Sequence, residues 1–276
     1  MSEIGKLLEA EGLAAERDTE SLTRRMVWSR DASHFRIVPG ATHRAVDLES
    51  VSKLLAIANK SGYPVTFRSG GSSLSGQTVG HGIVVDTRSG FQSLVSIGED
   101  SITAQPGVTL ARLNGHLSRR GRKVGPDPAS MVASTLGGAV SNNSSGMTCG
   151  TQLNSYRTIR SAKISFADGQ VLDTAAVDAD SQLEAMRPDI YHLLLKKRDE
   201  LRSNKDHQRK IRQLFALKNT MGYSLNAFLD FDSPVEILLR LLVGSEGTLA
   251  FLGEVELATV ETLPFRSANL LLFEDL

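Results

Sequence analysis

The stretch "FRSGGSSLSGQ", residues 67–77, governs how the rest of the chain is interpreted. It follows the apolar run "YPVTF" and places glycines among serines without the period of a helix or a strand. Such a run cannot form a core, but it offers unobstructed backbone N–H groups and small hydroxyls. These groups suit an anion, most often a phosphate, so the stretch predicts a phosphate-binding loop.

The composition excludes several classes of protein. The 276 residues contain 31 Lys and Arg against 31 Asp and Glu, so there is no net charge to attract nucleic acid. Only 5% of the residues are aromatic, which argues against base stacking, and the single cysteine excludes an intrachain disulfide. The N-terminus is charged, and no apolar run approaches the ~20 residues that span a bilayer. We therefore expect a soluble, cytoplasmic protein.

Caps and periodicity predict the regular elements. Asp47 is placed to begin a helix that Gly62 ends, and Thr109 and Ser233 are placed as caps of two further helices. The predicted helices span residues 47–62, 108–121 and 233–244, the predicted strands span 63–67, 82–89 and 251–260, and the predicted hairpins span 93–107 and 159–174.

Two further stretches resemble the first loop in composition. Residues 123–155 show no sustained period, and long connections of this kind are usually functional. They contain paired glycines, which allow close backbone approach, and the polar run Asn142–Ser145. The other stretch is "GSEGTLAF", residues 244–251. Three such loops predict a ligand larger than one phosphate, such as a dinucleotide, although neither the Rossmann glycine spacing nor a Walker lysine is present.

Residues 188–215 are rich in charge and predict a solvated helical insertion. The alternative is that its basic residues Lys205, Arg209, Lys210 and Arg212 contact a partner.

The order of the motifs resembles a known family. The stretches "PVTFRSGGSSLSGQ", "QPGVTLARLN", "GPDPAS", "TLGGAVSNNSSGMTCGT", "FADGQVLDT" and "VGSEGTLAFLGEVEL" are similar to the FAD-binding (PCMH-type) domain of the vanillyl-alcohol oxidase superfamily. Within it, the chain resembles the branch of D-lactate dehydrogenase, the flavin-binding chain of glycolate oxidase, and D-2-hydroxyglutarate dehydrogenase. The stretch "KNTMGYSLNAFLDF" and the charged insertion are most like the large dehydrogenases that also carry an iron–sulfur module.

The resemblance implies an α+β fold with FAD between two subdomains. Residues 1–94 would hold the pyrophosphate loop, and residues 95–262 would form the second subdomain with a helical insertion near 180–232. Residues 263–276 would begin a cap domain.

The resemblance also implies the residues of the cofactor site. Backbone N–H groups of Ser69 to Leu74 would bind the pyrophosphate, and Gln77 would lie towards the flavin. The expected cofactor-binding residues are Arg68, Ser69, Gly70, Gly71, Ser72, Ser73, Leu74, Gln77, Pro106, Gly107, Pro128, Ala129, Ser134, Gly137, Gly138, Asn142, Asn143, Ser144, Ser145, Gly146, Gly150, Thr151, Glu246 and Gly247.

Several of these residues have plainer interpretations. Gly70 and Gly71 are also typical of a tight turn, and Asn142 and Asn143 are also typical turn residues. Cys149 is interpreted as a buried, inert cysteine rather than a flavin attachment point. Some relatives bond the flavin to a histidine in the first loop, where this chain has Ser72 and Ser73, so we expect non-covalent FAD. The histidines are scattered, and no metal site is expected.

The resemblance implies the FAD-binding part of a flavin-dependent oxidoreductase that oxidises a 2-hydroxy acid such as D-lactate, glycolate or D-2-hydroxyglutarate. An electron acceptor would reoxidise the flavin, and any iron–sulfur cluster would lie further along a longer protein. The catalytic groups would lie in the cap, so no catalytic residue is assigned and the chain is expected to be inactive alone. The alternative is a nucleotide-binding module of the same fold with no redox role.

The last residues, "SANLLLFEDL", suggest an opening strand cut at a domain boundary. An unpaired apolar edge tends to pair with another chain, so we expect either a homodimer through this segment or disorder of it.

Overall fold

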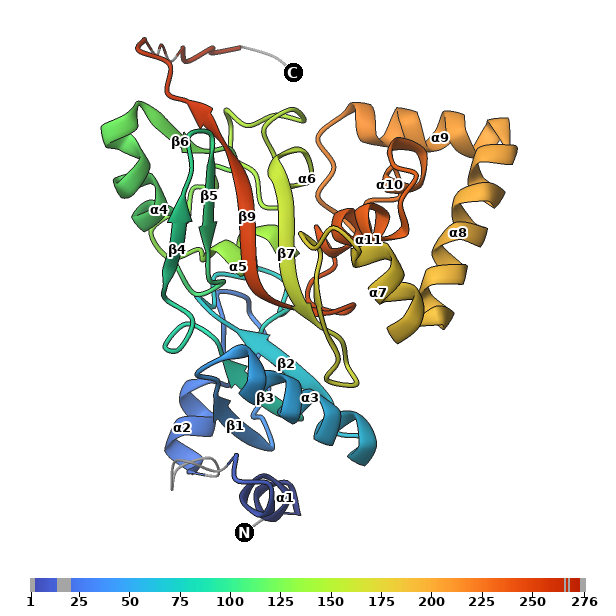
Figure 1. Ribbon diagram of the computed structural model, residues 1–276. Coiled ribbons are helices and arrows are strands. Elements are labelled where there is room, and N and C mark those ends of the chain that lie inside the picture. Colours follow the sequence, from blue (N-terminus) through green and yellow to red (C-terminus); the bar gives the residue numbers. More distant parts are fainter. Residues whose placement is uncertain (1–2, 14–20, 266, 268, 274–276) are drawn as a thin grey trace.

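The computed structural model describes residues 3–13, 21–265, 267 and 269–273. The chain forms two β-sheets surrounded by helices, which is the expected α+β fold (Figure 1). The three-stranded sheet has the order β1-β3-β2. The six-stranded sheet has the order β4-β5-β9-β7-β8, with β6 paired to β9 off this path.

The small sheet is parallel. Strands β1 (Ala41–Arg44) and β2 (Val65–Arg68) both pair with the central β3 (Ile83–Asp86). Helix α3 (Leu48–Ser61) supplies the crossover between β1 and β2, as parallel pairing requires. It begins and ends where the sequence predicts, because the Asp47 side chain accepts from the Ser50 N–H and the C-cap Gly62 has a φ of 72°.

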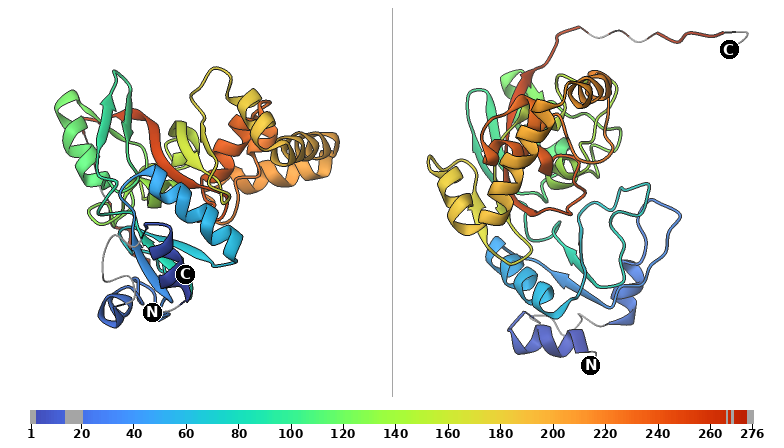
Figure 2. Two further views of the ribbon diagram at one scale, coloured as in Figure 1. Left: turned by 60° about the horizontal axis from the view of Figure 1, so that its bottom comes forward. Right: turned by 90° about the vertical axis from the view of Figure 1, so that its right-hand side faces the viewer.

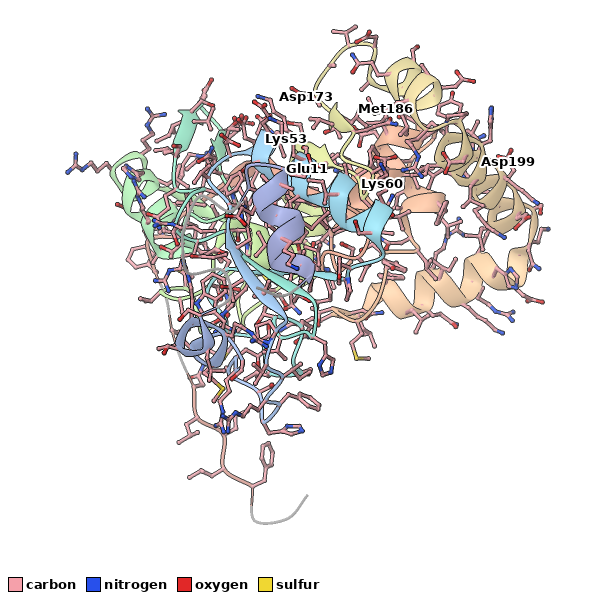
Figure 3. The ribbon with its side chains drawn as sticks, turned by 90° about the horizontal axis from the view of Figure 1, so that it is seen from below. Glu11, Lys53, Lys60, Asp173, Met186 and Asp199 are labelled. Carbon is pink, nitrogen blue, oxygen red and sulfur yellow. The ribbon has the colours of Figure 1, made fainter. Side chains whose placement is uncertain are left out.

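Helices α1 (Glu3–Ala10) and α2 (Leu22–Val27) flank the small sheet (Figure 1). Leu8 of α1 is buried in the same core as Val51, Leu54 and Ile83. Figure 3 shows α3 from below, with Lys53 and Lys60 along it and Glu11 beside it.

The large sheet is antiparallel. Its strands are β4 (Leu94–Ile97), β5 (Ser101–Ala104), β6 (Arg122–Val124), β7 (Ile159–Ser165), β8 (Val171–Asp173) and β9 (Phe251–Glu261). The two predicted hairpins are confirmed as β4-β5 and β7-β8. The late strand β9 lies between them, so the first and last parts of this unit share one sheet.

Short helices pack against this sheet. They are α4 (Leu110–Leu117), the 3-10 helix η1 (Ser118–Arg120), α5 (Leu136–Ser141) and α6 (Ser155–Thr158). The prediction that residues 123–155 lack regular structure is wrong for α5 and for the end of β6. Helix α5 has only 6 residues, two of them glycines, so its sequence is too short to show a helical period. It nevertheless buries Leu136 and Val140.

The helices expected in residues 188–215 are present as α8 (Pro188–Ser203) and α9 (Lys205–Ala216), with α7 (Ala179–Met186) before them and α10 (Ala227–Asp230) after them. That these helices form an insertion stays a prediction. They project to the side of the molecule, where Met186 and Asp199 are labelled in Figure 3. Only Leu194 of α8 and Ile211 of α9 are buried among the described residues of these two helices. Helix α11 (Pro234–Leu242), capped by Ser233 as predicted, returns the chain to the core.

The two sheets are joined by specific contacts. The hydroxyls of Ser52 in α3 and Ser165 in β7 form a buried hydrogen bond of 3.0 Å. The ring of Phe251, at the start of β9, lies 4.6 Å from the Phe67 ring and 5.3 Å from the Phe91 ring, centroid to centroid. These contacts fix the loops of one sheet against those of the other.

The described residues after β9 leave the large sheet at the end remote from the small sheet (Figure 2). Leu270 to Phe273 are exposed and form no strand. The predicted subdomain boundaries at residues 94/95 and 262/263 stay predictions.

Candidate functional site

A cavity of about 430 Å³ lies where the loops of the two sheets meet. Its walls come from the loop after β2, the turn after β5, residues 128–145, the turn from Glu246 into β9, and Lys218 with Thr220. Its volume is in the range typical of cofactor pockets.

Most of the predicted site residues meet at this cavity. The structure places these in its lining: Ser69, Gly70, Gly71, Ser72, Ser73, Leu74, Gln77, Pro106, Pro128, Ser134, Gly137, Gly138, Asn142, Ser144, Ser145, Glu246 and Gly247. The other predicted residues lie outside the lining: Arg68, Gly107, Ala129, Asn143, Gly146, Gly150 and Thr151.

Some lining residues were not predicted. They are Phe67, Ser75, Thr78, Thr87, Ser130, Thr135, Ser141, Lys218, Thr220, Ala250, Phe251 and Leu252. Lys218 and Thr220 belong to the stretch "KNTMGYS". Its resemblance to a family motif could have indicated that these two residues belong to the site. The apolar residues of β9 carried no signal, because a strand sequence does not show which side faces a ligand.

The first loop is shaped by its glycines. Gly71 has a φ of 63°, which favours glycine. A Cβ on Gly70 would lie 2.2 Å from the carbonyl oxygen of Ala133, so this part of the loop is pressed against the second loop. The Ser72 and Ser134 hydroxyl oxygens lie 3.5 Å apart across this contact. The first loop therefore makes a tight turn and also packs closely against the second loop.

The second loop packs equally closely on the turn after β5. Gly137 donates its N–H to the carbonyl of Pro106 at 3.0 Å, and a Cβ on Gly137 would lie 2.5 Å from the Cβ of Pro106. Pro106 and Gly137, two of the expected cofactor-binding residues, are thus in contact.

Asp127 holds the backbone of residues 146–149 in position. Its carboxylate accepts backbone N–H groups from Gly146, Thr148 and Cys149 at 2.9, 3.0 and 3.2 Å. Burial opposes ionisation of Asp127, but these bonds and the Thr148 hydroxyl lower its pKa. Cys149 is buried, as expected, and lies outside the cavity lining.

Glu246 and Asn142 form a polar pair in the cavity wall. The Asn142 Nδ2 donates to Glu246 Oε1 at 2.6 Å. Loss of solvation raises the pKa of Glu246, while hydrogen bonds from Asn142 and Gln77 oppose that rise. Glu246 has a φ of 53° and Asn143 a φ of 49°, an uncommon conformation outside glycine that clusters at functional sites.

Arg68 lies behind the first loop rather than in the cavity. A Cβ on Gly71 would lie 2.7 Å from Arg68 Nη2. Burial lowers the pKa of the Arg68 guanidinium, and the charges of Asp31 and Asp86 oppose this change. Its Nη1 is buried and has no hydrogen-bond partner in the described part of the chain. A cation held in this way adds positive potential behind the loop.

The unpartnered polar atoms fit a dinucleotide. Buried polar atoms normally have partners, yet Ser69 Oγ, Thr135 Oγ1, Asn143 Oδ1, Ser145 Oγ and Arg68 Nη1 have none among the described residues. Ser69, Thr135 and Ser145 line the cavity, whereas Arg68 and Asn143 lie outside its lining. Phe67, Phe251 and Leu252 add an apolar section to the lining, which suits an aromatic ring system.

Comparison with known protein families finds a match. Residues 39–175 match the FAD binding domain family. The matched segment includes the first loop, the turn after β5 and the second loop. The turn from Glu246 and the α9–α10 connection complete the cavity beyond this matched segment.

Curated relatives extend the likeness over most of the chain. A D-2-hydroxyglutarate dehydrogenase of Pantoea ananatis is 27% identical over 262 residues, which cover 91% of this chain and 25% of that protein. A D-lactate dehydrogenase of Archaeoglobus fulgidus is 28% identical over 241 residues, which cover 87% of this chain and 41% of that protein. The chain therefore spans less than half the length of these relatives.

A solved structure of alkyldihydroxyacetonephosphate synthase shares the fold. Its TM-score is 0.62 at 16% identity, covering 94% of this chain and 44% of that one.

Among the described residues, no group of three or more His, Cys, Asp or Glu side chains is arranged to hold a metal ion. No helix in the described part of the chain has the length and apolar character needed to cross a membrane.

Proposed function

We propose that the cavity binds FAD, with the pyrophosphate on the backbone N–H groups of residues 69–74. The observation that carries this proposal is that the glycine loop, the second loop and the unpartnered buried hydroxyls of Ser69, Thr135 and Ser145 meet at one cavity. Arg68 supports the pyrophosphate electrostatically from behind the loop. Phe67, Phe251 and Leu252 favour burial of one of the ring systems.

We propose that the cofactor is held without a covalent bond. Histidine and cysteine are absent from the described residues that line the cavity. Ser72 and Ser73 occupy the part of the first loop where some relatives carry the histidine that is bonded to the flavin. Acid precipitation of the holoprotein should leave all the yellow colour in the supernatant. Colour that remains with the pellet and disappears in Cys149→Ser would instead assign the thiol as an attachment point.

The proposed larger role is the FAD-binding part of a flavin-dependent oxidoreductase that acts on a 2-hydroxy acid. It is supported by the names of the curated relatives, a D-2-hydroxyglutarate dehydrogenase and a D-lactate dehydrogenase. When bound, the flavin would accept the C2 hydride of the acid while the hydroxyl proton passes to a base. We assign no described residue as that base. The electron acceptor and any iron–sulfur module belong to the longer protein in this proposal.

We also propose that residues 1–276 alone do not turn over a 2-hydroxy acid, and that they self-associate through the apolar segment after β9. The exposure of Leu270 to Phe273 supports the second part. Truncation before Ser267 should reduce self-association in sedimentation and leave FAD affinity almost unchanged. If the truncated protein self-associates as strongly as the full chain, this segment does not form the contact.

The second candidate is a nucleotide-binding module without redox activity, favoured by the same phosphate-binding loops. The purified protein should be titrated with FAD, FMN and ADP, and the FAD-bound form then mixed anaerobically with D-lactate, glycolate or D-2-hydroxyglutarate. Saturable binding of FAD with a yellow spectrum, and tighter than ADP, supports the proposal. Equal affinity for FAD and ADP would favour the module. Rapid bleaching by one of these acids would place the catalytic groups within residues 1–276.

A further inference from the structure

The segment between α9 and α10, residues 217–223, is the part of the insertion that reaches the cavity. Lys218 and Thr220 line it. The segment is anchored at its end, where the Tyr223 hydroxyl lies 2.8 Å from Thr248 Oγ1 and the buried Ser224 hydroxyl donates to the Val243 carbonyl at 3.0 Å. This segment therefore belongs to the cavity wall, in contrast to the solvated faces of α8 and α9.

Lys218 supplies the positive charge of the cavity. Every other described lining residue is neutral except Glu246. The Lys218 Nζ donates to the carbonyl oxygens of Gly146 at 3.0 Å and Ser145 at 3.5 Å. No carboxylate among the described residues lies within 4.0 Å of it. An ammonium has three donors, so two carbonyl contacts leave one donor and the whole charge available.

The surroundings of Lys218 favour an oxygen anion. Ser145, whose carbonyl contacts the ammonium, has a buried hydroxyl without a partner among the described residues. The hydroxyl of Thr220 belongs to the same segment as Lys218. A lysine ammonium binds carboxylate and phosphate oxygens as a point charge, and neighbouring hydroxyls add hydrogen bonds to the same oxygens.

We infer that Lys218 binds an anionic oxygen group of the ligand and fixes it beside Ser145. This inference rests on the proposed function, which offers two sources of such a group: the pyrophosphate of FAD and the carboxylate of a 2-hydroxy acid. In either case the insertion contributes directly to ligand recognition through its connecting segment.

The test uses Lys218→Met, which removes the charge and keeps an unbranched side chain, and Lys218→Arg, which keeps the charge. Lys210→Met, on the exposed surface of α9, is the matched control. FAD affinity is measured by fluorescence quenching at low and high salt. The second readout is the change in the bound-flavin absorbance spectrum on adding D-2-hydroxyglutarate or D-lactate.

A phosphate contact predicts that Lys218→Met weakens FAD affinity about tenfold, that the salt dependence becomes flatter, and that Lys218→Arg restores most of the affinity. A carboxylate contact predicts unchanged FAD affinity and loss of the spectral response to the acids. Lys210→Met should behave like the wild type in both measurements.

If Lys218→Met leaves both readouts at wild-type values, the inference is wrong. A wild-type protein that does not bind FAD would instead refute the proposed function, and this inference with it. Because Lys218 is exposed, its substitution should leave the melting temperature unchanged, so loss of the fold would not mimic either result.

Discussion

The loop after β2 and the cavity wall formed by residues 142, 218 and 246 carry different groups. The loop offers backbone N–H groups and serine hydroxyls, and its one cation, Arg68, lies behind it. The other wall offers the ionisable side chains of Glu246, in the turn before β9, and Lys218, in the α9–α10 connection, together with the amide of Asn142. One wall is thus defined by backbone shape and the other by side-chain charge.

This contrast determines how substitutions on the two sides should act. In the loop, a Cβ added at Gly70 would collide with the backbone of Ala133, and Gly71 and Gly76 have positive φ angles, so steric changes should dominate. In the other wall, side chains are partly solvated, so isosteric changes of charge should alter binding and pH dependence with little effect on the fold.

Gly70→Ala should have the largest effect. The new Cβ would lie 2.2 Å from the Ala133 carbonyl oxygen, so the loop must shift and its N–H groups lose their positions. Overpacking of this kind costs about 3 kcal/mol, which corresponds to about a hundredfold loss of FAD affinity. The measurement is an equilibrium FAD titration. The control is Gly115→Ala in α4, where an added Cβ meets nothing within 4 Å. Equal affinities for the two variants would contradict a sterically defined loop.

Arg68→Met should separate binding from stability. Removal of the charge behind the loop should weaken FAD affinity about tenfold. The melting temperature should stay the same or rise, because the buried guanidinium has an unpartnered Nη1. Arg88→Met, at an exposed position near the same sheet edge, is the control. A drop in melting temperature with unchanged affinity would show that Arg68 is structural only.

Ser73→Ala should have a modest effect. It removes one hydroxyl from the cavity lining and leaves the backbone N–H groups in place. We expect a loss of about 1 kcal/mol, or about fivefold in FAD affinity. The same titration with Ser96→Ala, an exposed serine of β4, provides the baseline. A loss as large as that of Gly70→Ala would mean that hydroxyls, not backbone groups, bind the pyrophosphate.

Glu246→Gln should have the smallest effect, and its sign depends on pH. Because the folded-state pKa of Glu246 is raised, the wild type loses stability as pH rises from the ordinary glutamate value through the raised one. Glutamine has no such cost. The variant should therefore gain stability relative to the wild type between about pH 4 and about pH 7, by less than about 1 kcal/mol because Glu246 is partly solvated.

Urea unfolding at both pH values measures this difference, with the exposed Glu184→Gln as control. A relative gain at the lower pH would reverse the assigned direction of the pKa shift.

The sequence predicts those parts of the fold that depend on neighbouring residues. Asp47, Thr109 and Ser233 act as caps because capping bonds reach only three residues along the chain. The hairpin that turns at Gly169 is local in the same sense. The glycine loop was recognisable because its composition is incompatible with any core.

The remaining features depend on contacts between distant segments. The central position of β9, and the packing of Phe251 on Phe67, join residues far apart in the sequence. Helix α5 is stabilised by burial rather than by propensity, since two of its residues are glycines. Lys218 lies at the cavity because α10 and α11 return the chain to the core, a path that charge patterning does not show.

The most direct test of the account is an experimental structure of the protein with FAD. We predict density for one FAD in the cavity between the two sheets, with pyrophosphate oxygens within hydrogen-bonding distance of the N–H groups of residues 69–74 and no covalent link to the flavin. A pyrophosphate bound elsewhere, with the loop after β2 making no contact to the cofactor, would contradict the assignment of residues 67–77 as the phosphate-binding loop.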